Sequence, residues 1–359
     1  MFFHSNHAVK SSPLIYTYFY ILFAIKPRIP SHRCMTWLIK NTLLILIAII
    51  AFMGISFNRI LLSWRIIELN LILFIPIMIF SKNFYFSNIM GLKYFLIQSL
   101  ASILLLSIII LRLIFSEKIL MRVFTFVALA WKIGIPPFHL WIINLMIDLN
   151  YHNFFIISTW QKVIPLYIIR RAPTNYLKII IVISLIFSII IRIDQLSVKK
   201  MLIISSIFIM AWVMAAVLFS SSFWMFVLWL YGIMLWLMTR GLFLLKSNNK
   251  IYILMLSNSL VEKVVLFMIT LSMAGFPPLM GFFLKLRIII ALIFLKMNFI
   301  SAAIIFSSVI LMYMYTTVFF LSLSNYSPEL TYLSTLNYLN SPLLYLGIGL
   351  LFLPLLLFF

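Results

Sequence analysis

Residues 119–147 read ILMRVFTFVALAWKIGIPPFHLWIINLMI, and this stretch decides how the chain folds. Its only ionisable side chains are those of Arg122, Lys132 and His139. It is also longer than the roughly 20 residues that cross a hydrocarbon core. Its centre carries Gly134-Ile-Pro-Pro137, and proline removes a helix hydrogen bond and opens the helix. The stretch therefore predicts a membrane helix that is interrupted near its middle.

Apolar runs of this kind fill most of the 359 residues, of which 65% are hydrophobic and 9% are charged. Soluble domains carry roughly 25% charged residues. The runs show no period-2 alternation, so helices remain as the only spanning form. We predict an all-α, polytopic protein of about eleven transmembrane helices. The expected spans lie near residues 37–57, 60–80, 91–114, 119–147, 153–170, 177–193, 200–219, 223–245, 258–295, 299–323 and 341–358.

The first 34 residues have a different character, because they carry seven basic or histidine side chains around one short apolar run, residues 14–25. That run is too short to span a membrane comfortably. It could be an amphipathic or targeting segment, or the reading frame could extend upstream of a start at Met35. We favour an N-terminal extension, residues 1–34, that is not native or is poorly ordered, followed by one transmembrane domain, residues 35–359.

The formal charge of +21 raises the possibility of nucleic-acid binding, which uses clustered lysine and arginine. Here the basic pairs, such as Arg170 with Arg171 and Lys199 with Lys200, stand at the ends of apolar runs. Basic residues at such ends orient helices and contact anionic headgroups. We therefore expect membrane lipids such as cardiolipin as partners and no nucleic acid.

Four ionisable residues lie inside predicted spans, namely Glu68, Lys132, Lys162 and Lys285. Placing an ionisable side chain at a bilayer centre costs at least about 2.5–3.5 kcal/mol, so each of these residues needs a partner, a water-filled cavity or a function. Removal from water favours the neutral amine of a lysine, which allows it to exchange protons. His139 could extend such a proton chain. The simpler alternatives are a hydrogen-bonded carboxyl near a helix end for Glu68 and a hydrogen bond at a helix break for His139.

A second interruption, Gly275-Phe-Pro-Pro278, resembles the first. Lys132 precedes its Gly-x-Pro-Pro element, whereas Lys285 follows the other one. Paired interruptions in two halves of a membrane chain indicate pseudo-symmetric repeats with an ion pathway between them. The reversed order of lysine and break is what an inverted repeat would give. The alternative is that both elements are simple loops between shorter helices.

Several segments, in order along the chain, resemble the mitochondrially encoded subunit 2 family of NADH:ubiquinone oxidoreductase, respiratory complex I. They are Trp64-Arg-Ile-Ile-Glu68-Leu-Asn70, Tyr94-Phe-Leu-Ile-Gln98, Trp131-Lys132-Ile-Gly134, Pro137-Phe-His139-Leu-Trp141, Thr159-Trp-Gln161-Lys162, and Gly275-Phe-Pro-Pro-Leu-Met-Gly281-Phe282 with Lys285. The resemblance runs from about residue 37 to the C-terminus.

This resemblance implies an antiporter-like fold of inverted repeats with two broken helices. It assigns Glu68 and Lys132 to a proton-input pair, Lys162 to a central relay and Lys285 to the exit side. It further implies a subunit of a proton-translocating NADH:ubiquinone reductase in the mitochondrial inner membrane, beside other membrane-arm subunits, including antiporter-like ones. NADH, FMN, iron–sulfur clusters and ubiquinone would be used by other subunits. This chain itself shows no phosphate-cradling loop, haem pattern or metal-ligand spacing, so we expect no cofactor and no redox centre in it.

The chain departs from the family pattern at two places. Residues 142–144 are Ile-Ile-Asn where the family usually has Pro-Glu-Val, so a carboxylate there is missing unless Asp148 replaces it. The proline and tryptophan that flank the last lysine in the family are Leu284 and Leu286 here. Two other functions stay open on the sequence alone: a stand-alone cation/proton antiporter of the same fold, and a structural membrane scaffold.

Overall fold

The structure, a computed structural model, describes residues 32–57, 59–80, 84–114, 118–171, 173–192, 198–219, 222–244, 260–277 and 279–324, and all regular structure in these ranges is α-helical. The predicted span near residues 341–358 and residues 1–31 lie outside them. In chain order the helices are α2 (His32–Ser56), α3 (Ile60–Ile79), α4 (Phe84–Ile114), α5 (Lys118–Ile133), α6 (Leu140–Asp148), α7 (Tyr151–Ser158), α8 (Trp160–Ile169), α9 (Thr174–Arg192), α10 (Val198–Phe219), α11 (Phe223–Leu244), α13 (Leu260–Ala274), α14 (Met280–Phe294) and α15 (Asn298–Ser324).

Seven of these helices are long and apolar enough to cross a membrane, which confirms the predicted all-α, multi-pass class. They are α2, α3, α4, α9, α10, α11 and α15. The remaining helices are shorter and follow one another in pairs, α5 with α6, α7 with α8, and α13 with α14. Each pair occupies one predicted span.

The two Gly-x-Pro-Pro elements end their helices in the same way. Gly134 and Gly275 both have a positive φ, 73° and 89°, which glycine adopts without strain. Each glycine N–H donates to the carbonyls three and four residues earlier, and the next residue donates to the carbonyl five residues earlier. This is the usual way in which a glycine satisfies the last carbonyls of a helix. The matching geometry supports two related breaks rather than two unrelated loops.

The third pair is broken at a position that the sequence did not reveal. Thr159, with φ −121° and ψ −76°, separates α7 from α8 inside the run predicted as one span. Its hydroxyl donates to the carbonyl of Phe155 at 2.7 Å, and its own carbonyl accepts the N–H of Lys162 at 3.1 Å. The break therefore precedes Lys162 by one turn.

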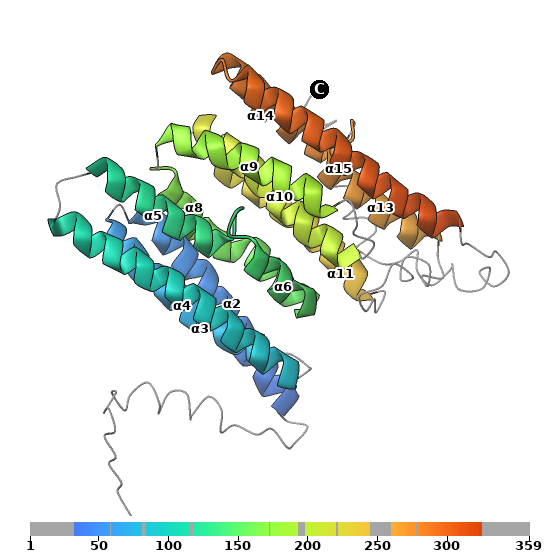
Figure 1. The fold of residues 1–359 in the computed structure, drawn as a ribbon. Coiled ribbons are helices and arrows are strands. Elements are labelled where there is room, and N and C mark those ends of the chain that lie inside the picture. Colours follow the sequence, from blue (N-terminus) through green and yellow to red (C-terminus); the bar gives the residue numbers. More distant parts are fainter. Residues whose placement is uncertain are drawn as a thin grey trace, which may run out of the picture.

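The two helix pairs that contain the Gly-x-Pro-Pro elements run in opposite directions. In Figure 1 the pair α5–α6 runs from upper left to lower right, whereas the pair α13–α14 runs from lower right to upper left. The broken spans are therefore inverted relative to one another, as an inverted repeat requires. Inversion keeps the order of residues along each repeat, so it does not account for Lys132 preceding its break and Lys285 following the other.

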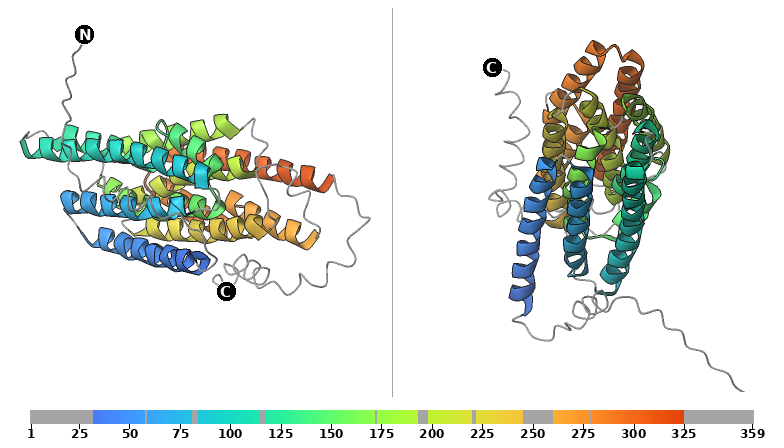
Figure 2. Two further views of the ribbon diagram at one scale, coloured as in Figure 1. Left: turned by 90° about the horizontal axis from the view of Figure 1, so that it is seen from below. Right: turned by 90° about the vertical axis from the view of Figure 1, so that its left-hand side faces the viewer.

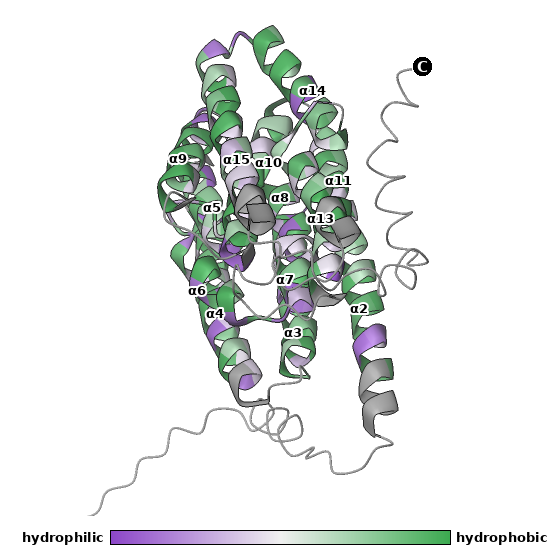
Figure 3. Ribbon diagram, turned by 90° about the vertical axis from the view of Figure 1, so that its right-hand side faces the viewer, coloured by the Kyte–Doolittle hydropathy of each residue, from purple (hydrophilic) through white to green (hydrophobic). Residues whose placement is uncertain are grey.

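The helix axes lie roughly parallel to one another, whichever way the chain runs along them (Figure 2). Within its apolar window 83% of the residues of α10 are buried, against 17% for α2 at the edge. Hydrophobic residues make up most of the helices, as the green ribbon of Figure 3 shows, and many of their side chains are exposed. Phe52, Ile114 and Phe294, for example, are 67%, 69% and 81% exposed. Such a surface suits hydrocarbon rather than water.

Candidate functional site

The centre of the candidate site is an ion pair between α3 and α5. Lys132 Nζ lies 3.3 Å from Glu68 Oε1, and the two residues are 64 positions apart in the sequence. The side chain of Lys132 is 3% exposed and that of Glu68 is 25% exposed. It is the one carboxylate–lysine pair within ion-pair distance among the described residues. The structure thus brings together the two residues that the sequence suggested as a pair.

The break after α5 leaves helix-end carbonyls that neighbouring side chains satisfy. Gln98 Nε2, from α4, donates to the carbonyl of Lys132, and Trp141 Nε1, from α6, donates to the carbonyl of Trp131, both at 3.1 Å. Unsatisfied carbonyls are costly inside hydrocarbon. Because these neutral donors cover the carbonyls, the amine of Lys132 is left to pair with Glu68.

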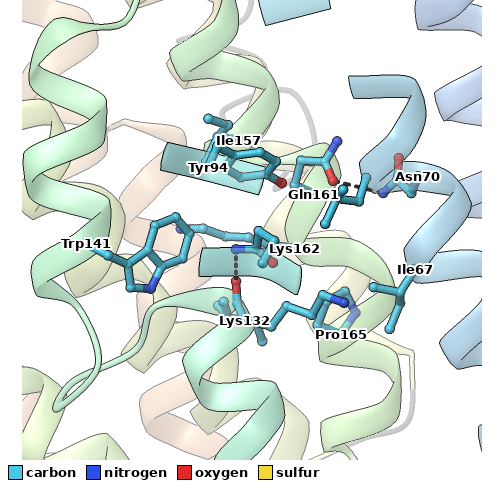
Figure 4. Close-up of a pocket in the computed structure, with 12 residues that line it drawn as sticks. Ile67, Asn70, Tyr94, Lys132, Trp141, Ile157, Gln161, Lys162 and Pro165 are labelled. Carbon is cyan, nitrogen blue, oxygen red and sulfur yellow. Dashed lines mark hydrogen bonds between the residues drawn. The ribbon is translucent and has the colours of Figure 1, made fainter. Parts of the chain in front are cut away.

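Lys162 and Lys132 line the same small cavity (Figure 4). Its volume is about 20 Å³, which is enough for one water, because a single water needs roughly 10–15 Å³. Lys162 itself is 3% exposed. The other lining residues are Ile67, Asn70, Leu71, Tyr94, Gln98, Ile133, Trp141, Ile157, Gln161 and Pro165. The two lysines therefore border one cavity that has room for about one water.

Amide side chains extend this polar cavity toward α3. Asn70 Nδ2 donates to Gln161 Oε1 at 3.0 Å, so α3 and α8 are joined next to Lys162. The remaining polar atoms of this pair, Asn70 Oδ1 and Gln161 Nε2, are buried and have no hydrogen-bond partner within the described part of the chain. Buried water usually bonds to polar groups of this kind. A water in the cavity would complete the hydrogen bonding of both amides.

Lys285 lies in a second, separate cavity between α10, α11, α13 and α14. Its Nζ donates to the carbonyl of Ala274, the last residue of α13. It also lies 5.3 Å from the ring centroid of Trp212 and 5.7 Å from that of Phe208. The cavity has a volume of about 40 Å³, and Tyr231 and Ser272 contribute its hydroxyls. Lys285 therefore occupies a polar position of its own at the second break.

Two sequence candidates lie outside these cavities. His139 is buried at the start of α6, where its Nδ1 is 3.2 Å from the carbonyl of Pro137 and its ring packs against Phe187 of α9. It lines neither lysine cavity. Asp148 is exposed at the end of α6 and does not take the place of the missing family carboxylate in either cavity.

The structure adds one buried cation, Lys199, that the sequence placed at a membrane surface. Lys199 is 6% exposed, and its Nζ donates to the carbonyls of Ile147 and Leu149, each at 2.5 Å. It also lies 5.6 Å from the ring centroid of Tyr151. These contacts cover carbonyls at the end of α6, where a cation is favourable. In the sequence Lys199 is only the first polar residue of a long apolar run, which does not distinguish a buried lysine from one at the lipid surface.

Known proteins resemble this chain in both sequence and fold. Residues 58–311 match the family model described as "NADH:quinone oxidoreductase/Mrp antiporter, TM". The protein "NADH-ubiquinone oxidoreductase chain 2" of Anopheles gambiae is 30% identical over 289 residues, which cover 77% of this chain and 83% of the relative.

Two solved structures share the fold. The first, titled respiratory complex I from Thermus thermophilus with bound Aureothin, matches with a TM-score of 0.69 at 19% identity, over 86% of this chain and 78% of the other. The second, an Mrp complex from Dietzia sp. DQ12-45-1b, matches with a TM-score of 0.63 at 15% identity, over 71% and 55%. The family model covers well over half of the chain, and the relative is aligned over most of its own length. The chain therefore belongs to the NADH:quinone oxidoreductase/Mrp antiporter family of membrane proteins, among the relatives named NADH-ubiquinone oxidoreductase chain 2.

Proposed function

We propose that this chain is a membrane-arm subunit of respiratory complex I that moves protons across the mitochondrial inner membrane while NADH reduces ubiquinone elsewhere in the complex. The observation that carries the proposal is the Glu68–Lys132 pair, whose lysine lines a small cavity together with Lys162. A structural scaffold has no need for three ionisable groups at that depth. The names of the relatives supply the identity of the assembly.

Within this function each residue has a distinct role. Glu68 and Lys132 form the input pair, and Lys162 receives the proton through the cavity that it shares with Lys132. Lys285 serves the exit side from its separate cavity. His139 joins the relay only through a rearrangement, because its ring now faces Phe187.

The energy and the cofactors come from other subunits. Each charge moved against 100 mV needs about 2.3 kcal/mol, which only redox chemistry elsewhere in the assembly supplies. NADH, FMN, iron–sulfur clusters and ubiquinone accordingly belong to other subunits. The partners of this chain are the neighbouring membrane-arm subunits, antiporter-like ones among them, and membrane lipids such as cardiolipin.

The second candidate function is a stand-alone monovalent cation/proton antiporter, which the fold shared with an Mrp complex favours. The two functions differ in what the chain does alone. The purified chain in liposomes would exchange Na⁺ or K⁺ for protons if it were an antiporter. A complex I subunit should be inactive alone and should co-purify with a large membrane and peripheral assembly.

The test of the relay is proton translocation by the assembled complex in proteoliposomes, measured per NADH oxidised. Lys132→Met and Lys285→Met should each lower it strongly, because each removes a proton-carrying amine. Lys178→Met is the matched control, since this lysine lies half-buried near the start of α9 and lines neither lysine cavity. If both relay variants pump protons at the full rate, the assignment is wrong.

A further inference from the structure

Three arginines line one cavity at one end of the bundle. The cavity has a volume of about 290 Å³. Arg112 belongs to the last turn of α4, Arg122 to the second turn of α5, and Arg171 follows the end of α8. The other lining residues are Ile60, Thr125, Phe126, Leu129, Ile168 and Ile169. Because helix ends and beginnings meet here, the cavity lies near one surface of the membrane.

The charged residues that line this cavity in the described part of the chain are all arginines. None of the described lining residues is acidic, and the hydroxyl of Thr125 is occupied by a 2.8 Å hydrogen bond to the carbonyl of Arg122. Arg122 is exposed, and Arg112 and Arg171 are half-buried, so all three are accessible from the membrane surface. Arg171 also lies 5.8 Å from the ring centroid of Tyr167. Guanidinium groups bind phosphate oxygens in a forked geometry, so the cavity fits a phosphate group.

The helices beside the cavity are strongly apolar on the outside. Ile114 at the end of α4 is 69% exposed, and Leu120 and Phe124 on α5 are 46% and 49% exposed. A soluble anion would neutralise the arginines and leave these side chains uncovered. An anionic phospholipid satisfies both requirements, because its headgroup carries the phosphate and its acyl chains cover apolar surface.

We propose that the cavity lined by Arg112, Arg122 and Arg171 binds the phosphate headgroup of an anionic phospholipid, with its acyl chains along α4 and α5. Lipid binding at this site does not depend on the proton relay, nor on whether the lysines carry protons. The lipid would nevertheless join three of the helices that line the polar cavity. Gln98 belongs to α4, Lys132 to α5 and Lys162 to α8.

The test uses the assembled complex and a photoactivatable phosphatidylglycerol probe in phosphatidylcholine vesicles. Crosslinking to this chain should be strong in the wild type and roughly tenfold or more weaker in Arg112→Gln/Arg122→Gln, because each lost charged hydrogen bond accounts for about a factor of ten. Lys178→Gln is the matched control, since it removes a positive charge from a helix that does not line the cavity. It should crosslink as the wild type does.

Competition identifies the source of the phosphate. Excess unlabelled cardiolipin or phosphatidylglycerol should abolish the crosslink, whereas inorganic phosphate and phosphatidylcholine should not. Equal competition by inorganic phosphate would show a soluble-anion site and overturn the proposal. Unchanged crosslinking in the arginine variant would overturn it as well, because the cavity would then be filled by something else, such as an acidic segment of a neighbouring subunit.

A conservative variant keeps the test valid if the glutamine variant does not assemble. Arg112→Lys/Arg122→Lys retains both charges and loses the forked geometry, so crosslinking should fall to a level between the wild type and the glutamine variant. Full crosslinking in the lysine variant, with normal assembly, would contradict recognition by guanidinium groups.

Discussion

The Glu68–Lys132 pair makes a prediction whose size follows from the structure. At 3.3 Å and an effective dielectric constant of about 20, two unit charges attract by about 5 kcal/mol. Removing one partner of a buried pair costs about 3–5 kcal/mol, because it leaves the other charge unpaired. A quarter of the Glu68 side chain is exposed, so the lower end, about 3 kcal/mol, applies. Glu68→Gln and Lys132→Gln should each lower the free energy of unfolding by about this amount.

The double variant separates pairing from other effects. In Glu68→Gln/Lys132→Gln no charge is left unpaired, so the loss in the free energy of unfolding should fall short of the sum of the single losses by about 2–3 kcal/mol. The assay is reversible unfolding of the full-length chain in detergent micelles. The control cycle pairs Lys132→Gln with Asp148→Asn, because the carboxylate of Asp148 is exposed at the end of α6. The losses in the free energy of unfolding should add within about 0.5 kcal/mol in this cycle. A coupling below about 0.5 kcal/mol in the Glu68 cycle would refute the reasoning.

Three further substitutions test other parts of the site. Gly134→Ala should destabilise the chain by about 1–3 kcal/mol, because Gly134 has a positive φ and a Cβ there would lie 2.0 Å from the side chain of Ile142. Gly232→Ala is the control, since its Cβ would meet only an ordinary 3.6 Å contact, and it should cost under about 1 kcal/mol. Thermal unfolding measures both. Lys199→Met leaves two helix-end carbonyls without their donor and should lower the free energy of unfolding by about 2–4 kcal/mol. Lys200→Met is the control, because Lys200 is less buried, and it should change the free energy of unfolding by under about 1 kcal/mol. Lys162→Met should keep the complex assembled and lower proton translocation at least tenfold, and an unchanged rate of pumping would remove Lys162 from the relay.

Hydropathy was enough to predict the helical spans within the described residues, and the Gly-x-Pro-Pro elements were enough to predict two breaks. Both signals are local, because a long apolar run and a missing helix donor act on the segment that contains them. The break at Thr159 carries no glycine, and the nearest proline lies six residues later, so the local rule found no signal. Its geometry depends on how the hydroxyl of Thr159 bonds back to the preceding turn.

The sequence alone could not predict which side chains of different helices contact one another. Nothing in the spacing of Glu68 and Lys132 showed that they meet, and only the packing of α3, α4 and α5 brings them to 3.3 Å. The burial of Lys199 was missed for a related reason. A helix that is apolar all round has no preferred face, so the pattern cannot distinguish a lysine at the lipid surface from one packed beneath another helix. His139 shows the reverse case, since its sequence neighbours suggested the relay and its packing points to α9.

The two breaks share their backbone geometry but use their lysines differently. At the first break the carbonyls at the end of α5 accept hydrogen bonds from the neutral donors Gln98 and Trp141, and the amine of Lys132 pairs with a carboxylate. At the second break Lys285 itself donates to the last carbonyl of α13. A neutral amine keeps two N–H groups, so after losing a proton Lys285 can still donate to that carbonyl, through a weaker hydrogen bond that no longer carries a charge. Within the proposed relay, proton loss at Lys285 would therefore weaken a hydrogen bond to the backbone of its break, whereas proton loss at Lys132 would remove its attraction to the carboxylate of Glu68.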